Sequence, residues 1–399
     1  MDYASATPLD PAVVRAMTRA LKVNGNPSAP HDEGRAARQL VDDARGRLGK
    51  TLSVRPETLY FTGSGTESNN LAIVGFVEAL VAHLPAQAGG ATYSSLHLIT
   101  SAFEHPSVLE PIEFLKSKGV MVSYIAPNKE GIVSVDDVLK EVRPETVLIS
   151  LATVQSEIGQ VQPLKDLSRA LAKVRRRREQ TSQHLTPECA LPILHTDASQ
   201  GSLFLDVRPE RLGADLVTYD AQKVRGPKGV GLLYKHSSVP LAPVIRGGSQ
   251  ERKLRAGTEN VVGIVGMARA FERAEEGRSQ RVTKVEEVRD YFIELLKKEM
   301  PDVVINGGMK HRIANNIHVS VPGADGDYLA VLMDKEGVAV SPRSACIASG
   351  THSTAVLALG ASEDQALGTL RFTFAPDVTR ADARRAVAAL KRARTIYAI

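Results

Sequence analysis

The sequence predicts an α/β protein in which a large domain with a seven-stranded, mostly parallel sheet is followed by a smaller α+β C-terminal domain. The length of 399 residues is enough for about two to three domains of roughly 150 residues each. Between about residues 55 and 235, short apolar runs rich in β-branched residues alternate with helical patterns, which is typical of βαβ units. Near Val261 the pattern changes to long helices and isolated strands.

Seven apolar runs predict the strands of the large sheet. In an open α/β sheet, ligands bind beyond the carboxyl ends of the strands, so the polar residues that follow each run are the first candidates for a functional site. The runs are Thr58–Thr62, His97–Thr100, Val120–Ala126, Val147–Val154, Leu191–Thr196, Asp215–Tyr219 and Gly229–Tyr234.

The C-terminal part of the chain predicts a separate, smaller domain. We divide the chain into an N-terminal segment of residues 1–15 that packs with the small domain, a large domain of residues 16–260 and a small domain of residues 261–399. A final helix starts at Thr379, whose hydroxyl and Asp382 three positions later resemble a capping box. The other elements expected there are helices over Val261–Glu276 and Thr283–Met300 and strands at Ile317–Val321 and Leu370–Phe374.

The composition narrows the class of protein. With 43% hydrophobic and 24% charged residues, the chain is globular rather than disordered or fibrous. No apolar run approaches the roughly 18 residues of a membrane helix, and the first residues lack a basic and an apolar signal region, so we expect an unexported protein with no membrane partner. The two cysteines, Cys189 and Cys346, lie far apart, which excludes a disulfide framework and indicates a cytoplasmic protein.

The charge pattern does not indicate nucleic-acid binding. The net charge of +5 comes from 50 basic and 45 acidic residues, and a nucleic-acid site needs clustered basic residues. The strong cluster, Arg175–Arg178, lies in a polar stretch that runs to about Glu188. Aromatic residues make up only 5% of the chain, so stacking platforms are scarce. We interpret the cluster as part of a solvated surface loop and expect no nucleic-acid partner.

A glycine-rich turn follows the first predicted strand and precedes the helical pattern Leu71–Leu80. Its glycines allow a tight turn, and the free N–H groups and dipole of a helix N-terminus attract phosphate, to which Thr66 and Ser68 add hydroxyls. An ordinary capped strand-to-helix turn is equally compatible. The turn is not a P-loop, because no Gly-Lys-Ser/Thr follows it. Its sequence is Gly63-Ser64-Gly65-Thr66-Glu67-Ser68-Asn69-Asn70.

Three more polar residues follow predicted strands at the same edge. Asp197 is suited to hold the protonated ring nitrogen of a pyridine cofactor, and equally to cap a helix. Lys223 precedes a Gly/Pro-rich turn and could form a Schiff base, although most single lysines are surface residues. His105 could stack on a flat ring and shuttle protons, although a helix cap is the more common role. The order of phosphate turn, aspartate and lysine favours the cofactor interpretation.

The small domain adds two candidates. Cys346 lies in the small, polar segment Ser341–Thr351, which is typical of an exposed loop. An exposed thiol near cations can ionise and act as a nucleophile, whereas a buried cysteine, which we expect for Cys189, is inert. Arg371 could bind a substrate carboxylate through its planar guanidinium, with a surface salt bridge as the alternative.

Taken together, these residues match a known family. Over nearly its whole length the chain resembles the cysteine desulfurases, pyridoxal-phosphate enzymes of aminotransferase class V. That resemblance implies the pyridoxal-phosphate-dependent transferase fold of type I. Ten ordered motifs carry the match: Asp2-Tyr3-Ala4-Ser5-Ala6-Thr7-Pro8-Leu9-Asp10-Pro11, Gly25-Asn26-Pro27-Ser28, Thr62–Asn70, Glu104-His105, Glu157-Ile158-Gly159, His195-Thr196-Asp197-Ala198-Ser199-Gln200, Lys223, Arg255-Ala256-Gly257-Thr258-Glu259-Asn260, Ser344-Ala345-Cys346 and Leu370-Arg371-Phe372.

The resemblance implies roles for residues that hold pyridoxal 5'-phosphate. Lys223 would carry the cofactor as a Schiff base, Asp197 would bind the pyridine nitrogen, Gln200 the ring hydroxyl oxygen, and His105 would stack on the ring. The phosphate would be held by three residues, one of which comes from the second subunit of a homodimer. These are Gly65, Thr66 and, from the second subunit, Thr258.

The resemblance also implies the substrate, L-cysteine, and the route of its sulfur. Asn26 and Arg371 would bind the substrate carboxylate, and Cys346 would accept the sulfur as a persulfide while alanine is released. The segment from Cys346 to Leu357 is long, as in the branch of the family whose mobile loop hands sulfur to a scaffold protein. The partners expected are therefore L-cysteine and a sulfur-acceptor or iron–sulfur scaffold protein.

The chain departs from the family pattern at three places. Asp220 and Gln222 replace a hydroxyl residue and a histidine before Lys223, and Gln155-Ser156 replaces Asn-Asn. We assign all three of Gln155, Asp220 and Gln222 to the cofactor site. A carboxylate beside a phosphate dianion is repulsive unless it is protonated or turned away, so we expect Asp220 to orient a donor or Lys223. Gln222 cannot titrate as a histidine can, which would alter proton delivery to the phosphate side. The contact to the ring hydroxyl is expected to be either weaker or supplied by Gln155.

Two rival functions stay open at the level of sequence. A selenocysteine lyase shares the scaffold, and the polar insertion Arg175–Glu188 resembles the insertion of those lyases. A non-catalytic scaffold that binds a sulfur-carrier protein is the rival from another class. The presence of Lys223 and Cys346 favours an enzyme over that scaffold.

Overall fold

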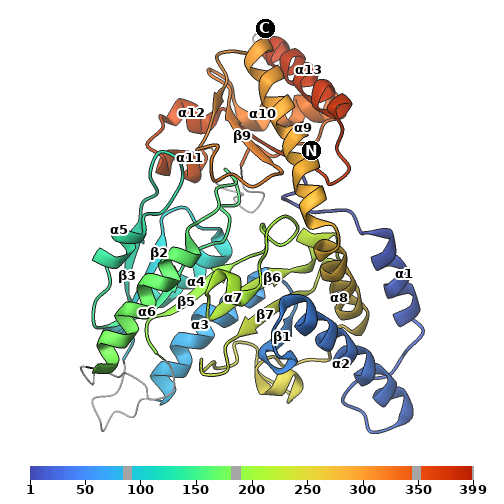
Figure 1. The fold of residues 1–399 in the computed structure, drawn as a ribbon, viewed down its shortest axis with the longest axis vertical. Coiled ribbons are helices and arrows are strands. Elements are labelled where there is room, and N and C mark those ends of the chain that lie inside the picture. The colour runs from blue at the N-terminus through green and yellow to red at the C-terminus, as the bar shows by residue number, and fades with distance from the viewer. Residues whose placement is uncertain (84–91, 181–189, 344–351, 398–399) are drawn as a thin grey trace.

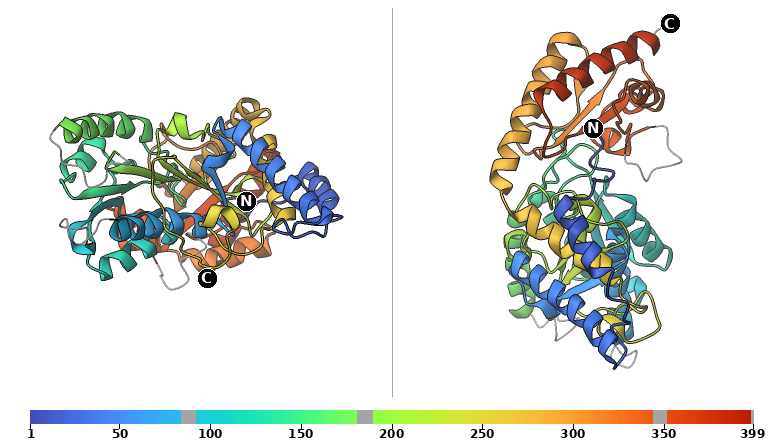
Figure 2. Two further views of the ribbon diagram at one scale, coloured as in Figure 1. Left: turned by 90° about the horizontal axis from the view of Figure 1, so that it is seen from below. Right: turned by 90° about the vertical axis from the view of Figure 1, so that its right-hand side faces the viewer.

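The computed structural model describes residues 1–83, 92–180, 190–343 and 352–397. They form a large lobe around a central sheet and a smaller lobe that holds the C-terminal helices (Figure 1). The N-terminus lies near the junction of the two lobes (Figure 2). Among the helices of the described ranges, none is both long and apolar enough to cross a membrane.

All seven predicted runs form strands of one sheet, in the order β1-β7-β6-β5-β4-β2-β3. Strand β7 runs antiparallel to its neighbours β1 and β6, and the other four pairs are parallel. The predicted α/β class and mostly parallel sheet are therefore confirmed. The strands are β1 (Leu59–Thr62), β2 (His97–Ser101), β3 (Met121–Ile125), β4 (Thr146–Ser150), β5 (Ile193–Asp197), β6 (Leu216–Asp220) and β7 (Gly231–Lys235).

The helices of the large lobe cover the sheet, and one of them begins earlier than its apolar pattern predicts. Helix α3 starts at Gly65 rather than near Leu71, because the hydroxyl of Ser64 accepts the N–H of Glu67 at 3.1 Å and caps the helix there. The glycine turn is thus the first turn of α3. The helices are α1 (Pro11–Ala20), α2 (Asp32–Leu52), α3 (Gly65–His83), α4 (Pro106–Ser117), α5 (Val135–Lys140), α6 (Leu164–Gln180) and α7 (Pro209–Leu212).

The arginine cluster is helical, so the prediction of a solvated loop is wrong for Arg175–Arg178. These residues belong to α6, since arginine is a good helix former. Arg175 donates to the carbonyl of Pro192 at 2.7 and 2.9 Å and pairs with Asp215 at 2.5 Å. Arg178 donates to the carbonyl of Thr146 at 2.9 Å. Cys189 and the rest of the polar stretch after residue 180 lie outside the described residues.

The small lobe packs helices against a three-stranded antiparallel sheet of order β10-β9-β8. Helix α9 begins five residues before the predicted Thr283, because Gly277, with φ +66°, ends the preceding helix and α9 starts directly after it. Thr379 and Asp382 form the predicted reciprocal cap, at 2.9 and 3.3 Å. Helix α8 (Val261–Glu275) packs against α1 and α2 in the large lobe (Figure 1). The elements of the small lobe are α9 (Arg278–Glu299), β8 (Val304–Ile305), β9 (Asn316–Ser320), α10 (Gly326–Lys335), α11 (Thr354–Ala358), α12 (Glu363–Leu367), β10 (Thr369–Thr373) and α13 (Arg380–Tyr397).

The first residues of the chain connect the two lobes. Asp2 bridges Thr373 of β10 in the small lobe. Five residues later, the N–H of Thr7 donates to the carbonyl of Gln222 at 3.2 Å, in the turn that carries Lys223. The domain boundaries at residues 15 and 260 remain predictions.

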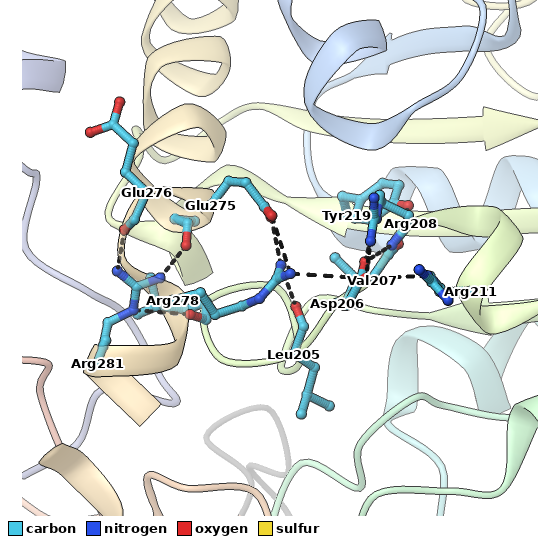
Figure 3. Close-up of polar contacts among 12 residues, drawn as sticks. Leu205, Asp206, Val207, Arg208, Arg211, Tyr219, Glu275, Glu276, Arg278 and Arg281 are labelled. Carbon is cyan, nitrogen blue, oxygen red and sulfur yellow. Dashed lines mark hydrogen bonds and ion pairs between the residues drawn. The ribbon is translucent and has the colours of Figure 1, made fainter. Parts of the chain in front are cut away.

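A second connection joins the segment after β5 to the junction of α8 and α9 (Figure 3). Arg278 donates to the carboxylate of Glu275 at 2.6 Å and to the carbonyl of Leu205 at 3.2 Å. Arg281 donates to the carbonyl of Leu203 at 3.2 Å. These guanidinium groups fix the start of α9 against the large lobe.

Candidate active site

The predicted site residues gather around one cavity at the carboxyl edge of the large sheet. Strands β2, β4, β5 and β6 are parallel, so the residues that follow them meet at the same edge. Nine residues assigned to the site line this cavity. They are Gly65, Thr66, His105, Gln155, Asp197, Gln200, Asp220, Gln222 and Lys223.

Asp197, the last residue of β5, presents its carboxylate to this cavity. Its Oδ1 accepts the N–H of Ser199 at 2.9 Å, and its Oδ2 accepts an N–H of Asn69 at 2.8 Å. Both partners are neutral. The negative charge of Asp197 is therefore held in place by these groups without an ion pair to either of them, which is the state needed to bind a protonated ring nitrogen.

His105 both caps helix α4 and lines the cavity. Its Nδ1 accepts the N–H of Ser107 at 3.1 Å and lies 2.8 Å from the Ser107 hydroxyl. Burial lowers the pKa of His105, an effect that the nearby carboxylate of Asp197 partly opposes. The imidazole is thus favoured in its neutral form, with a flat, uncharged face.

Asn69 and Ser107 connect Asp197 with His105, and the sequence analysis gave neither of them a role. The side-chain amide of Asn69 donates one hydrogen to Asp197 and the other to the Ser107 hydroxyl, each at 2.8 Å. Asn69 lies four residues after Gly65 on α3, so a helical reading from Gly65 places both on one face. That spacing was the available signal.

Lys223 lies in a single 3₁₀ turn, η4 (Ala221–Val224), directly after β6. Its Nζ donates to the carbonyl of Ala4 at 2.6 Å and to that of Ser5 at 2.8 Å. Gln200 also donates to the carbonyl of Ala4, at 3.1 Å. The N-terminal segment therefore forms one wall beside the lysine.

Glu104, which the family motif contains but which received no role, is a buried acid in the cavity wall. Its Oε1 accepts from the Ser101 hydroxyl at 2.7 Å and from the N–H of Ala152 at 3.0 Å. Its Oε2 is buried and makes no hydrogen bond to the described residues. Burial raises the pKa of Glu104 to about 7.

The turn at the start of α3 meets a carboxylate. The N–H of Gly65 donates to Oδ2 of Asp220 at 3.2 Å. Gln222 donates its main-chain N–H to Oδ1 of Asp220 at 3.0 Å and its side-chain amide to Oδ2 at 3.2 Å. The two departures from the family pattern before Lys223 thus contact each other.

Gln155 lines the cavity, but its side-chain amide forms hydrogen bonds to main-chain groups of the surrounding loops. The Oε1 atom accepts the N–H groups of Glu157 and Ile158, both at 2.7 Å. The Nε2 atom donates to the carbonyl of Phe103 at 3.0 Å. A contact between Gln155 and a ring hydroxyl remains a prediction.

Four predicted residues are not among those that line the cavity. Asn26 and Thr258 are exposed. Arg371 is almost fully buried and donates to the carbonyl of Ser156 at 2.9 Å. It also pairs with Asp2 at 3.1 Å. The salt bridge expected as the alternative role of Arg371 therefore exists, but its guanidinium is buried rather than at the surface. Ser156 lines the cavity, so its bond with Arg371 places the guanidinium directly behind the cavity wall. Cys346 lies outside the described residues.

The residues of the cavity fit a pyridoxal ring, and some of the groups that would bind its phosphate are present. A carboxylate, a neutral imidazole and a lysine amine face one space, which is the donor set that a pyridine aldehyde requires. At the start of α3, the Ser199 hydroxyl is buried and has no hydrogen-bond partner among the described residues. A Cβ added to Gly65 would lie 3.3 Å from that hydroxyl, so a larger residue here would crowd this approach.

Comparisons with known proteins agree with this geometry. The sequence profile of the aminotransferase class-V family matches residues 1–385. A protein of Dictyoglomus turgidum named cysteine desulfurase IscS is 37% identical over 98% of this chain and 93% of its own length. One of Archaeoglobus fulgidus, named cysteine desulfurase IscS 1, is 32% identical over 93% of this chain and 90% of its own length.

Solved structures show the same fold. A NifS-like protein superposes with a TM-score of 0.86 at 28% identity, covering 99% of this chain and 98% of its own. The protein SspA in complex with cysteine superposes with a TM-score of 0.74 at 30% identity, covering 94% and 98%. With a family profile that spans nearly its full length and relatives above 30% identity, the chain belongs to the aminotransferase class-V family.

Proposed function

We propose that this chain is a pyridoxal-phosphate-dependent cysteine desulfurase that converts L-cysteine to L-alanine and passes the sulfur to Cys346. The observation that carries the proposal is the convergence of Asp197, His105 and Lys223 on one cavity, in a chain whose relatives are named cysteine desulfurases. The sulfur then passes to an acceptor or iron–sulfur scaffold protein, and the enzyme acts as a cytoplasmic homodimer.

The cofactor supplies an electron sink at its protonated ring when it is bound. Asp197 would hold the proton on the ring nitrogen, and Asn69 and Ser199 fix its carboxylate by donating to its two oxygens. His105 offers a neutral face to the ring. Gln200, anchored to the N-terminal segment, would bind the ring hydroxyl oxygen.

Lys223 would hold the cofactor aldehyde and would also serve as the base. Its amine is held by the carbonyls of Ala4 and Ser5, which accept hydrogen bonds from the protonated form. With its amine free, Lys223 would take the Cα proton of the substrate. The N-terminal segment orients this proton transfer because it lies at hydrogen-bond distance from Nζ.

The substrate carboxylate would bind at Arg371 and Asn26. In the structure Arg371 holds Asp2, and its Nε is buried without a partner among the described residues, so a carboxylate could use it. The thiolate of Cys346 then attacks the substrate sulfur. An S–S bond would form as the C–S bond breaks, the electron pair left on Cβ would take a proton, and Lys223 would return the proton to Cα, which gives alanine.

The test is the visible absorption spectrum of the purified protein before and after addition of cysteine. The wild-type protein shows a visible band that cysteine changes, and Lys223→Ala loses that band and all release of alanine. Cys346→Ser keeps the band and its response to cysteine but forms no persulfide. A Cys346→Ser variant that desulfurates cysteine at the wild-type rate would contradict the nucleophile assignment.

The same assay separates the rivals. Alanine release from selenocysteine but not from cysteine would identify a selenocysteine lyase. A protein that stays colourless when pyridoxal phosphate is added would be the non-catalytic scaffold. Release of alanine from cysteine supports the desulfurase.

A further inference from the structure

Asp220 and Gln222 form a bonded pair at the start of helix α3, where the cofactor phosphate is expected. Asp220 is only 6% exposed. Its Oδ2 accepts the N–H of Gly65, the first residue of α3, at 3.2 Å. Gln222 holds the same carboxylate with two N–H groups, at 3.0 and 3.2 Å. A helix N-terminus that would attract phosphate is therefore bonded to an anion of the chain itself.

A second observation indicates that this spot is built for a further ligand. The Ser199 hydroxyl is buried there without a hydrogen-bond partner among the described residues. A Cβ on Gly65 would lie 3.2 Å from Oδ2 of Asp220 and 3.3 Å from the Ser199 hydroxyl, so all three groups face one small space. The hydroxyl and the helix N-terminus favour an incoming anion, whereas the carboxylate repels it.

We infer that Asp220 competes with the cofactor phosphate for the N-terminus of α3. In the structure its carboxylate accepts the Gly65 N–H, and it must give up that bond when the phosphate binds. Like charges in a water-poor site repel strongly, so the phosphate group adds less to cofactor affinity here than it would beside an uncharged residue. The inference rests on the proposed function, because it takes pyridoxal phosphate as the ligand.

The hydrogen bonds from Gln222 explain why Asp220 stays where it competes with the phosphate. A lone aspartate could turn away from the phosphate, but two N–H groups of Gln222 fix this carboxylate toward Gly65. Displacement of Asp220 therefore lowers the affinity for the cofactor. Asp220 thus determines what fraction of the enzyme carries cofactor at a given cofactor concentration and how readily the cofactor exchanges.

The experiment compares two ligands that differ only in the phosphate. Wild-type protein, Asp220→Asn and Asp220→Ser are titrated with pyridoxal phosphate and with pyridoxal, and binding at Lys223 is followed by visible absorption. Asparagine keeps the size and the acceptor oxygen but removes the charge. Both variants should bind pyridoxal phosphate at least about tenfold more tightly, with less than about a twofold change for pyridoxal.

Glu110→Gln is the matched control. Glu110 is an exposed residue of α4 that lines the neighbouring open cavity, and its change removes the same charge from the same side of the lobe. Neither ligand should change affinity by more than about twofold in this variant. A gain equal to that of Asp220→Asn would mean that only the general charge matters, which would overturn the inference.

A phosphate-only readout makes the test independent of Lys223. Inorganic phosphate should raise the melting temperature of Asp220→Asn more than that of the wild-type protein. The inference is overturned if wild-type protein binds both ligands but neither Asp220 variant gains affinity for the phosphorylated one. If no protein binds either ligand at Lys223, the proposed function fails and the inference fails with it.

Discussion

In two regions of the molecule, charged side chains form hydrogen bonds to main-chain carbonyls. The two regions differ in whether all their buried polar atoms have a hydrogen-bond partner. At the junction of α8 and α9, Arg278 and Arg281 bond carboxylates and carbonyls, and none of the side chains labelled in Figure 3 has a buried polar atom without a partner. Around Lys223, the Ser199 hydroxyl and Oε2 of Glu104 are buried and make no hydrogen bond within the described ranges.

The difference separates a structural network from a binding site. A buried polar group without a partner costs about 1–3 kcal/mol, so a fold retains one only where another requirement outweighs that cost. At the junction, the labelled side chains have hydrogen-bond partners for their buried polar atoms, and these bonds stabilise the arrangement of the lobes. In the cavity, some buried polar atoms lack a partner among the described residues, and a ligand with polar groups would provide one. Substitutions at the two regions should therefore affect different properties.

The largest effect is expected for Asp197→Ala, which should lower turnover of cysteine about a thousandfold. The carboxylate that holds the ring proton is lost, and two neutral donors, the Asn69 amide and the Ser199 N–H, lose an acceptor. The free energy of unfolding of the cofactor-free protein should fall by no more than about 1–3 kcal/mol. Alanine release and urea unfolding measure the two quantities. A large loss of stability with normal turnover per folded molecule would assign Asp197 to the scaffold.

The next effect is a pH dependence of stability caused by Glu104. Its pKa in the folded protein, about 7, lies above its ordinary value of 4.5, so the folded state binds the proton more tightly than the unfolded chain does. The stability this provides is complete below about pH 4.5 and is lost as the pH rises to about 7, a total of about 3 kcal/mol. Glu104→Gln keeps the acceptor oxygen and should lack this loss in urea unfolding of the cofactor-free protein. Parallel pH curves for the two proteins would show that Glu104 does not titrate there.

At the junction, Arg281→Met should lower the free energy of unfolding by about 2 kcal/mol. The change removes the donors to the carbonyls of Leu203 and Glu276, at 3.2 and 3.3 Å, and leaves the cavity untouched. Turnover per folded molecule should stay within about twofold of wild type. Arg273→Met is the control, since its exposed ion pair with Glu276 contributes less than about 1 kcal/mol. Equal losses of stability in the two variants would remove the special role of the network.

The sequence predicts the strands of the large sheet and the site residues that follow them. Each of the seven strands coincides with an apolar run, because burial of both faces of a parallel sheet leaves a continuous apolar pattern. The strand-end rule located Asp197, His105 and Lys223 at one edge, since that rule depends only on the order of strands and loops.

Contacts between distant segments could not be predicted in this way. Asp220 lies 155 residues from Gly65, and no local pattern shows that its carboxylate bonds that N–H. Arg175–Arg178 form part of a helix rather than the expected loop, because a polar run does not reveal their partners, the carbonyls of Pro192 before β5 and of Thr146 at the start of β4. The start of α3 at Gly65 was missed because a capping serine, not an apolar residue, determines it.

The smallest effect concerns Ser107, which positions His105 within the cavity. Ser107→Ala removes the hydroxyl that receives Asn69 and lies 2.8 Å from Nδ1 of His105, but it keeps the main-chain N–H that caps the ring. Turnover should fall about tenfold or less. Burial is the main reason that the pKa of His105 is lowered. A hydroxyl that donates to Nδ1 would favour the neutral imidazole further, so its loss should raise the pKa of His105 and move the acid limb of the kcat/KM profile to higher pH. Ser107→Thr keeps the hydroxyl and should restore the profile. A merely structural serine would lower stability without moving the acid limb, and the link between Asp197 and His105 would then be packing alone.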